Sequence, residues 1–350
     1  MSGYELRRAD TSLDESQDAV RDAFAAFFAK QCPTSAVRAS EPLGFDRAMW
    51  QQLAGMGVAA MSLPPAAGGD DATVLDLVLI AEECGRRLAP VPFASHVAAT
   101  RLLGRTDAPG ALRDAAMAGE RVVTVAHSPA RPGVAQLVPD AAVAADVIAL
   151  VDGELSVFSA ASPGKHVPNQ GSTPLAWWEI DDSATRTTLA TGTAAVEAHE
   201  TALREWKLLT AAALVGLTEG ALSLGVAFAK TRETMGVPIG TLQGVAFPLV
   251  DVAIDVSAAR NLIYKAAWTM HNEPGRRPEL ALMAFDTARN TATNGTIVAA
   301  HVQGGLGFTV EADASLYFLR AKGWSALAGD SSADLVRIGA AFVANAGEPA

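Results

Sequence analysis

The sequence predicts a mainly helical α+β protein, with an N-terminal helical domain, a small middle β domain and a C-terminal four-helix bundle. Long Ala- and Leu-rich stretches with helical spacing occupy the first and last parts of the chain. Short β-rich runs bounded by Gly, Pro and Asp lie only between them. We therefore expect the three domains to cover residues 1–119, 120–197 and 198–350.

The first domain contains patterns for three helices. Residues 14–30 alternate charges with apolar side chains at helical spacing, and residues 45–55 form a helix that ends at a glycine. Residues 74–88 again place apolar and polar side chains on opposite faces. The Pro- and Gly-rich segment 63–70 and the prolines after Ala89 separate these helices from their neighbours.

The middle domain is expected to be a small sheet, and the last domain a helical bundle. Strands are predicted at residues 121–126, 146–151 and 155–158, with one more within 187–196. Helices are predicted at residues 202–231, 243–271, 280–303 and 334–344. Long helices with a short connecting loop suit antiparallel neighbours in a bundle.

The composition limits the possible functions. The chain has 350 residues, of which 50% are hydrophobic, and this is enough for a large buried core. Its net charge is −11 and it has no cluster of Lys and Arg, so neither a nucleic acid nor a membrane is expected as a partner. The polar N-terminus is unlike a signal peptide, and the longest apolar stretches, such as residues 141–151, are too short to span a bilayer. We expect a cytoplasmic protein.

The residues that commonly bind metals are not arranged as ligands. Cys32 and Cys84 are far apart and form no CxxC motif, so two reduced thiols are expected. The six histidines have no metal-ligand spacing. We therefore expect no metal site.

Two Gly-punctuated stretches in the last third of the chain carry the clearest functional signal. The first runs from Arg232 to Gln243 and places an arginine in a loop before a helix, where the guanidinium and the exposed N–H groups favour a pyrophosphate. The second runs from His301 to Phe308 and ends a helix with glycines that let a ligand approach the backbone. Either stretch alone is equally well explained as an ordinary helix-terminating loop.

Together, the two stretches resemble the acyl-CoA dehydrogenases, whose R-x-x-F-G-x-P-I/L…Q and Q/H-x-x-G-G-x-G-F/Y-T patterns have this spacing. Residues 44–57, 68–69 and 81–85 look like the first helical domain of that family, and residues 136–146 look like its β-domain connection. The resemblance covers nearly the whole chain. It implies FAD-dependent α,β-desaturation of an acyl-CoA thioester, in which a carboxylate removes the α-proton and the flavin takes the β-hydride. It also implies an electron-transfer flavoprotein or a similar electron acceptor.

The catalytic carboxylate of that family is missing from its usual place. The family has a glutamate in one of two positions, and the first corresponds here to Ala328. Counting back from Arg232, the second corresponds to Trp206, with Glu205 beside it. Because neighbouring helical residues are rotated by about 100°, we expect Glu205 to face elsewhere unless the helix contains an offset. Glu205 stays a candidate base, and a solvated charge near a helix start is the simpler interpretation.

Two other acids lie close to the usual place of the base. Asp330 and Asp334 follow Ala328 in a Ser-rich segment that precedes the last predicted helix. Short acidic side chains at such positions commonly cap the N-terminus of a helix. We therefore interpret both as helix caps and leave the catalytic residue unassigned.

The resemblance also implies which residues hold the cofactor. In the family, each FAD lies at a subunit interface, with its ring held by one subunit and its pyrophosphate and adenine end held by the neighbour. The residues that match the neighbour's share are Arg232, Thr234, Gln243, His301, Gly304 and Gly305. In contrast, residues 126–136 pass almost directly into the alanine-rich connection, without the hairpin that helps to cover a subunit's own flavin ring.

The chain thus matches the residues that hold a neighbour's FAD but not those that hold its own, which is expected of a subunit that completes the cofactor site of another chain. Some actinobacterial acyl-CoA dehydrogenases that act on steroid side-chain CoA thioesters are α2β2 heterotetramers, in which one chain brings the base and the other completes the cofactor site. The resemblance therefore favours a subunit that acts on an acyl-CoA substrate together with a second acyl-CoA dehydrogenase-like subunit. Two alternatives stay open: a self-sufficient homotetrameric dehydrogenase with Glu205 as its base, and a flavin-less scaffold subunit.

Overall fold

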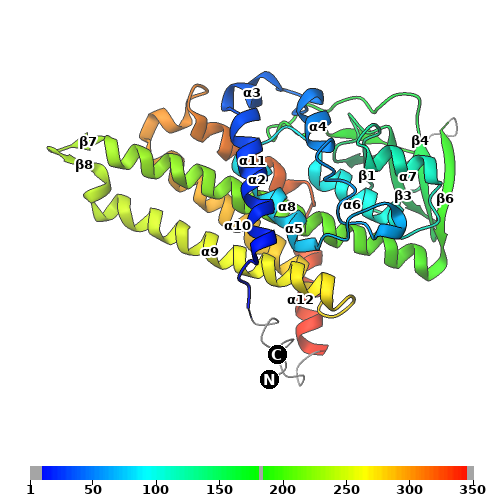
Figure 1. Cartoon of the computed structure of the whole chain (residues 1–350). Coiled ribbons are helices and arrows are strands. Elements are labelled where there is room, and N and C mark those ends of the chain that lie inside the picture. The colour runs from blue at the N-terminus through cyan, green and yellow to red at the C-terminus, as the bar shows by residue number, and fades with distance from the viewer. Residues whose placement is uncertain (1–9, 181–183, 345–350) are drawn as a thin grey trace. The chain divides into compact units, whose positions relative to one another are not determined.

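A computed structural model describes residues 10–180 and 184–344, and helices predominate in it (Figure 1). The chain forms two compact units. The first combines the segments Met1–Thr34, Val74–Ala89 and Lys207–Ala350, and the second combines Ser35–Thr73 with Pro90–Trp206. The predicted fold class is confirmed, because helices precede and follow a middle segment of the chain that contains the two larger sheets. The division into three sequence domains stays a prediction.

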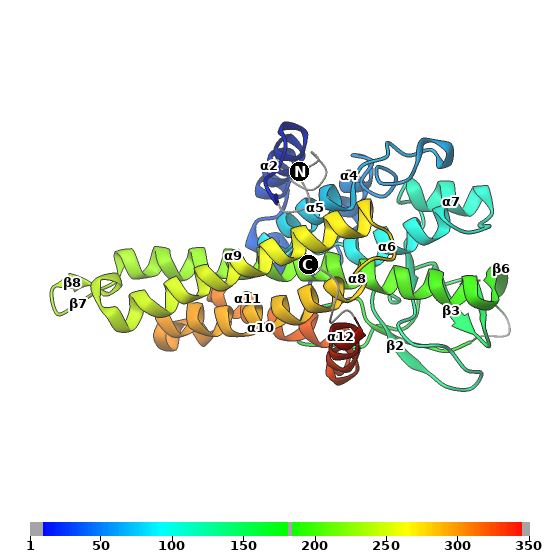
Figure 2. The ribbon, with the colours of Figure 1, turned by 90° about the horizontal axis from the view of Figure 1, so that it is seen from below.

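The first unit is a bundle of long helices. These are α2 (Glu15–Gln31), α5 (Val74–Arg86), the part of α8 (Gly192–Thr231) that follows Trp206, α9 (Gln243–Asn272), α10 (Glu279–Val302), α11 (Asp313–Ala326) and α12 (Ser332–Ala344). α2 begins with a capping box in which Asp14 and Gln17 each accept the other's backbone N–H. α10 packs along α9 and also against α11 (Figure 1, Figure 2).

Glycines allow α5 and α8 to approach each other closely within the first unit. A Cβ atom on Gly85 of α5 would lie 1.8 Å from the carbonyl oxygen of Ala213 in α8. A Cβ atom on Gly216 of α8 would likewise lie 1.8 Å from the carbonyl oxygen of Glu82 in α5. No side chain fits at either position, so these two glycines permit the close crossing of the helices.

By length and composition, α8 qualifies as a membrane-spanning helix, contrary to the expectation that no apolar stretch is long enough. Its most apolar window is 50% buried inside the protein. Side chains such as Leu209, Ala212 and Leu214 are almost fully buried there. This burial is typical of a core helix in a bundle.

The second unit contains the larger sheets. A four-stranded sheet has the order β1 (Val123–Val125), β3 (Asp146–Val151), β4 (Glu154–Ser159) and β6 (Thr185–Thr191), with β1 parallel to β3 and the other pairs antiparallel. A separate antiparallel pair joins β2 (Gln136–Val138) to β5 (Ala176–Trp178). The short helices between Thr34 and Met117 are α3 (Thr34–Ala39), α4 (Arg47–Ala54), the 3-10 helix η1 (Pro65–Ala67), α6 (Phe93–Gly104) and α7 (Gly110–Met117).

The central strand β3 is buried on both faces, which explains its continuous apolar run. On one face, Ile148 and Leu150 join a cluster with Leu102 of α6. On the other face, Val147 packs in a second cluster that includes Phe158 of β4. The core of the second unit therefore extends on both sides of the sheet.

The β segment is short, as the sequence predicts. Between β1 and β2, residues 126–135 are all described and contain only an isolated bridge between Arg131 and Val134. This described segment therefore forms no regular strand of its own.

Four α-helices, α3, α6, α7 and α11, are not predicted from the sequence, and α8 begins earlier than predicted. α6 is buried around most of its circumference, so its sequence lacks the alternation of apolar and polar faces from which a helix is predicted. The strand predicted within residues 187–196 ends at Thr191, because α8 already begins at Gly192 rather than at residue 202.

Candidate functional site

The first predicted cofactor stretch forms a hairpin that joins α8 to α9 (Figure 1). β7 (Glu233–Thr234) pairs antiparallel with β8 (Val237–Pro238). Met235 and Gly236 form the tip, where φ is 52° and 79°. Met235 is 94% exposed, the highest value among the large apolar residues that the structure describes. The hairpin therefore presents an apolar side chain that its own unit leaves uncovered.

Arg232 and Gln243 flank this hairpin. Arg232 follows α8 directly, and its carbonyl oxygen accepts the N–H of Ile239 at 2.8 Å. The 3-10 helix η2 (Ile239–Thr241) then leads to Leu242, the N-cap of α9, whose side chain makes no capping hydrogen bond. The first N–H groups of α9, beside Gln243, thus lack a side-chain cap, and a helix N-terminus of this kind favours an anion.

The second predicted stretch follows α10 in the 3-10 helix η3 (Gly304–Phe308). Two of its glycines are required by the fold: φ is 62° at Gly304, and a Cβ atom on Gly307 would lie 2.2 Å from the carbonyl oxygen of Ala300. Gly305 has neither constraint, since no atom of the described residues lies within 4 Å of a Cβ atom built there. A glycine that the chain does not need for its own packing is consistent with a ligand that approaches the backbone.

Close packing brings these two stretches to the same end of the helical unit (Figure 1, Figure 2). A Cβ atom on Gly225, near the end of α8, would lie 3.3 Å from the Cα of Ala299 in α10 and 3.2 Å from the Cδ2 of Leu249 in α9. Ala299 precedes His301 by half a helical turn, and Gly225 lies two turns before Arg232. The close contact of α8, α9 and α10 at Gly225 therefore holds the ends of α8 and α10, and with them the two predicted cofactor stretches, near each other.

The predicted polar cofactor residues are exposed and available. Arg232, Thr234, Gln243 and His301 all have exposed side chains. None of these side chains forms a hydrogen bond or ion pair with residues 10–180 or 184–344. Their hydrogen-bonding groups can therefore serve a ligand or a second chain without breaking an existing interaction.

The residues near the usual base position have structural partners. Ala328 lies in the turn between α11 and α12 and carries no acid. Asp330 accepts the N–H of Ser332 at 3.0 Å, which confirms its role at the start of α12. Asp334 does not cap the helix, because it lies inside the first turn of α12, where it is buried and paired with Lys207.

Glu205 is buried and paired, so its interpretation as a solvated charge is wrong. Its residue is only 2% exposed, and its carboxylate accepts from Arg101 at 3.0 Å and from both terminal nitrogens of Arg105 at 2.6 and 2.7 Å. Burial by itself would raise the pKa of Glu205, but the two arginines outweigh it and lower the pKa to about 2. The arrangement is that of a structural ion pair and disfavours Glu205 as a proton acceptor.

Trp206, which the family resemblance aligns with the second base position, is held firmly. It is 3% exposed, and its indole N–H donates to the hydroxyl of Ser95 at 3.2 Å. Its ring also lies edge-on to that of His127, with the centroids 4.1 Å apart. Ser95 in turn hydrogen-bonds the carboxyl of Asp140, whose pKa burial raises to about 6. These contacts fix the orientation of the indole of Trp206.

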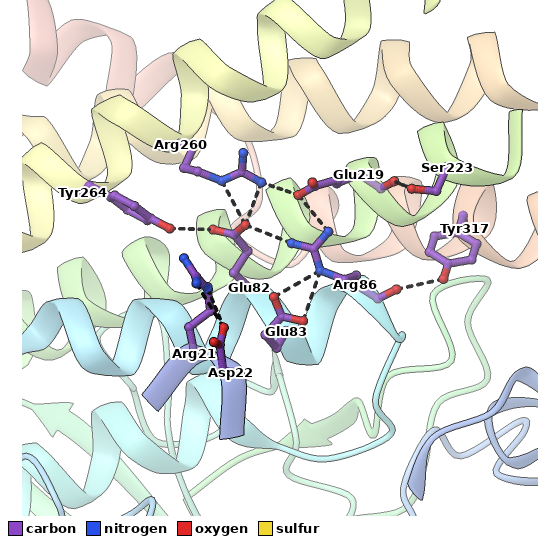
Figure 3. A network of polar contacts seen from close by, with 10 residues as sticks. All are labelled: Arg21, Asp22, Glu82, Glu83, Arg86, Glu219, Ser223, Arg260, Tyr264 and Tyr317. Atoms are coloured by element: carbon purple, nitrogen blue, oxygen red, sulfur yellow. Dashed lines mark hydrogen bonds and ion pairs between the residues drawn. The ribbon is translucent and has the colours of Figure 1, made fainter. Parts of the chain in front are cut away.

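The helical unit also contains a polar network that joins three of its helices (Figure 3). Arg260 of α9 donates to Glu82 of α5 at 2.9 and 2.7 Å. Arg86 of α5 donates to Glu83 at 3.1 Å and pairs with Glu219 of α8 at 2.8 Å. Each carboxylate has an arginine partner, so the network braces α5, α8 and α9. The spacing within α5 is visible in the sequence, but the partners on α8 and α9 are not.

A cavity of about 220 Å³ opens elsewhere in the first unit. Asp14, Leu75, Tyr264 and Lys265 are among its lining residues, together with Trp268, whose ring lies 5.4 Å from the Lys265 ammonium. None of the predicted cofactor residues lines this cavity.

Comparison with known families and proteins gives consistent results. Residues 14–106 match the family description "Acyl-CoA dehydrogenase, N-terminal domain", and residues 191–342 match "Acyl-CoA dehydrogenase, C-terminal domain". The chain is 30% identical to acyl-CoA dehydrogenase IpdE2 of Mycobacterium tuberculosis over 319 residues, which cover 88% of this chain and 92% of that protein. It is 29% identical to acyl-CoA dehydrogenase FadE27 of the same organism, over 84% of this chain and 88% of that protein.

Two solved structures share the fold over almost the whole chain. A chain of the ChsE4–ChsE5 complex from Mycobacterium tuberculosis is 25% identical, with a TM-score of 0.83, and the match covers 97% of this chain and 100% of that one. A chain of a Tcur3481–Tcur3483 steroid ACAD (acyl-CoA dehydrogenase) variant is 26% identical, with a TM-score of 0.83. The match covers 95% of this chain and 99% of that one.

Proposed function

The chain belongs to the acyl-CoA dehydrogenase family, and we propose that it completes the FAD site of a second, dissimilar subunit of that family. The observation that carries this proposal is a contrast within the chain. Arg232, Gln243 and His301 are exposed and have no partner within the described residues. Neither Ala328 nor Trp206 supplies the acid that the family uses as its base. The chain has kept groups that suit a cofactor tail and has lost the group that acts on the substrate.

FAD is the cofactor of this family, and when bound it accepts the hydride that leaves an acyl-CoA thioester during desaturation. In the proposed arrangement, the guanidinium of Arg232 pairs with the pyrophosphate through its fixed fork of donors. Gln243 adds an amide beside the uncapped N-terminus of α9, and Thr234 and His301 add a hydroxyl and an imidazole. Gly304 and Gly305 leave space for the cofactor to approach the backbone.

The two alternatives account for fewer observations. A self-sufficient enzyme needs a free base, whereas the carboxylate of Glu205 is occupied by Arg101 and Arg105 and has a pKa of about 2. A flavin-less scaffold subunit gives no reason for Gly305, which the packing of the chain does not require, or for the exposed guanidinium of Arg232.

The proposed substrate of the assembly is a CoA thioester with a bulky acyl group, such as a steroid side chain. The support is the similarity to the steroid ACAD and to one chain of the ChsE4–ChsE5 complex, at 26% and 25% identity. The second complex also supports a dissimilar partner subunit. An electron-transfer flavoprotein or a similar protein is proposed as the electron acceptor on the family resemblance.

Purification tests the proposal directly. The chain expressed alone is expected to lack flavin absorbance, and to gain it when coexpressed with an acyl-CoA dehydrogenase-like chain that has a glutamate at one of the two base positions. A yellow chain that desaturates acyl-CoA alone would support the self-sufficient enzyme. Absence of flavin with every such partner would support the scaffold.

A further inference from the structure

Exposed apolar side chains are concentrated in the C-terminal part of the first unit. Of the large apolar residues that the described chain leaves exposed, fourteen of nineteen lie between Met235 and Val343. Single exposed apolar residues are normal on a protein surface, whereas a group of neighbours marks an interaction site. The group on α9 is the most regular of them.

The first half of α9 is apolar on two faces. Leu249, Val252 and Val256 are buried within the helical unit. Phe247, Val250 and Ile254 lie on another face and are 58%, 55% and 60% exposed. A helix that covers a core normally turns polar side chains outward. We refer to Phe247, Val250 and Ile254 as the outer stripe, and none of the described residues covers it.

The outer stripe continues the row that begins at a proposed cofactor residue. At about 100° per residue, Gln243, Phe247, Val250 and Ile254 fall within an arc of about 60° on the helix. Gln243 is also exposed. A subunit whose FAD tail reaches Gln243 would therefore extend over the stripe that follows along the same face.

The charges beside the outer stripe favour a dissimilar partner over a second copy. Asp251 and Asp255 are exposed next to it, and α9 has no Lys, Arg or His before Arg260. A symmetric contact between two copies would place this acidic border against itself, and the chain already has a net charge of −11. An apolar patch bordered by Lys and Arg complements both the stripe and its border.

We propose that the outer stripe of α9 is the docking surface for the dissimilar, flavin-carrying subunit, which meets it with an apolar patch bordered by basic side chains. The identity of the partner rests on the proposed function. The location of the surface rests on exposure and charge, and it can be tested without cofactor or activity.

The test measures complex formation between the purified chain and the coexpressed partner described above. Phe247→Ser and Ile254→Glu are each expected to raise the Kd at least about tenfold, because truncated or charged side chains at the centre of an interface remove most of its affinity. Trp177→Ser is the matched control, since Trp177 is also 58% exposed but lies in the second unit. We expect Asp251→Lys to weaken binding less and to reduce its salt dependence. The melting temperature of each variant alone checks that it is folded.

Each outcome decides between specific alternatives. An unchanged Kd for both stripe variants overturns the docking surface, while the cofactor role still stands if Arg232→Ala lowers FAD content. A wild-type chain that self-associates in analytical ultracentrifugation, and loses this association on Ile254→Glu, assigns the stripe to a second copy and overturns the proposal. If the stripe variants abolish binding but Arg232→Ala leaves FAD content unchanged, the docking surface stands and the cofactor role fails. If no partner binds, both fail.

Discussion

Two neighbouring residues of α8 show how finely the local geometry is set at the residue scale. Glu205 turns its carboxylate to Arg101 and Arg105, and Trp206 turns its indole to Ser95. Both sets of partners lie on α6 or at its C-cap, so the divergence that helical rotation predicts for the two side chains stays a prediction. The burial of Glu205 could not be predicted, because its arginine partners lie about a hundred residues earlier in the chain and no spacing rule pairs them.

The buried ion pair predicts that Glu205→Gln destabilises the protein. The change leaves Arg101 and Arg105 without their carboxylate, which is expected to cost about 3 kcal/mol of unfolding free energy. Because the pKa of Glu205 is lowered from 4.5 to about 2, the wild-type contribution is complete above pH 4.5 and is lost as the pH falls toward 2. Chemical denaturation at pH 7 measures the loss.

Glu200→Gln on the same helix serves as the control, since Glu200 is half exposed and its pairing with Arg204 at 3.7 Å is long. It is expected to change the unfolding free energy by less than about 1 kcal/mol. If Glu205→Gln keeps the stability of the wild type but abolishes turnover by the isolated chain, the ion-pair interpretation is wrong and Glu205 is the base.

Asp140 is expected to lower stability at neutral pH. It is buried, and burial raises its pKa from 3.8 to about 6 despite the hydrogen bond with Ser95. A raised carboxyl pKa means that the penalty is absent below pH 3.8, grows between pH 3.8 and 6, and is complete above pH 6. Asp140→Asn is therefore expected to stabilise the protein by about 1–3 kcal/mol at pH 7.5 and to have little effect at pH 4.

Asparagine also suits the backbone at this position, because φ is 60° at Asp140 and Asn tolerates the left-handed region. Asp152→Asn is the matched control, since Asp152 has φ of 50° but is exposed. Thermal melting at the two pH values compares the variants. An Asp140→Asn gain that persists at pH 4, or that Asp152→Asn reproduces, would rule out desolvation as its cause.

At the scale of elements, periodicity identifies helices whose sequence places apolar and polar side chains at helical spacing, whether or not the polar side chains are exposed. Residues 74–85 of α5 are all buried, but its polar Glu82 and Glu83 keep the pattern visible and pair with Arg86. α2, α5, α9 and α10 begin and end within two residues of the predicted positions, because each has an apolar stripe and recognisable end signals. α6 is buried almost all round, and β2 and β5 are too short to form a pattern. Glycine spacing predicts loops at the ends of α8 and α10, and their cofactor role stays a prediction. The sequence does not reveal that Gly307 serves packing whereas Gly305 does not.

The crossing of α5 and α8 predicts an unusually costly glycine substitution. Gly216→Ala would place a Cβ atom 1.8 Å from the carbonyl oxygen of Glu82, so the helices must separate. We expect a loss of about 3 kcal/mol or more, at the upper end of overpacking effects. Gly339→Ala in α12 is the control, because nothing lies within 4 Å of its added Cβ atom. It should be neutral or stabilise by about 1 kcal/mol. Equal melting temperatures for the two variants would contradict the close crossing.

At the scale of the whole molecule, two surfaces of the first unit point to another chain. The exposed groups of Arg232, Gln243 and His301 can bind an anionic cofactor tail, and the outer stripe of α9 can bind an apolar protein surface. Neither Ala328 nor Trp206, the two positions that the resemblance aligns with the family's base, carries an acid. Under the proposed function, the contribution of these two surfaces is measured in the assembly with the second subunit.

The last prediction separates cofactor binding from folding and assembly. Arg232→Ala is expected to leave the melting temperature of the chain alone unchanged, because Arg232 has no side-chain partner within the described residues. In the coexpressed assembly, the loss of a charge-assisted contact worth about 1.5–3 kcal/mol should raise the Kd for FAD roughly 10- to 150-fold. Arg276→Ala, in the exposed loop between α9 and α10, is the control. Flavin absorbance after equilibrium dialysis measures the affinity, and an unchanged Kd for Arg232→Ala would remove Arg232 from the cofactor site while leaving the assembly intact.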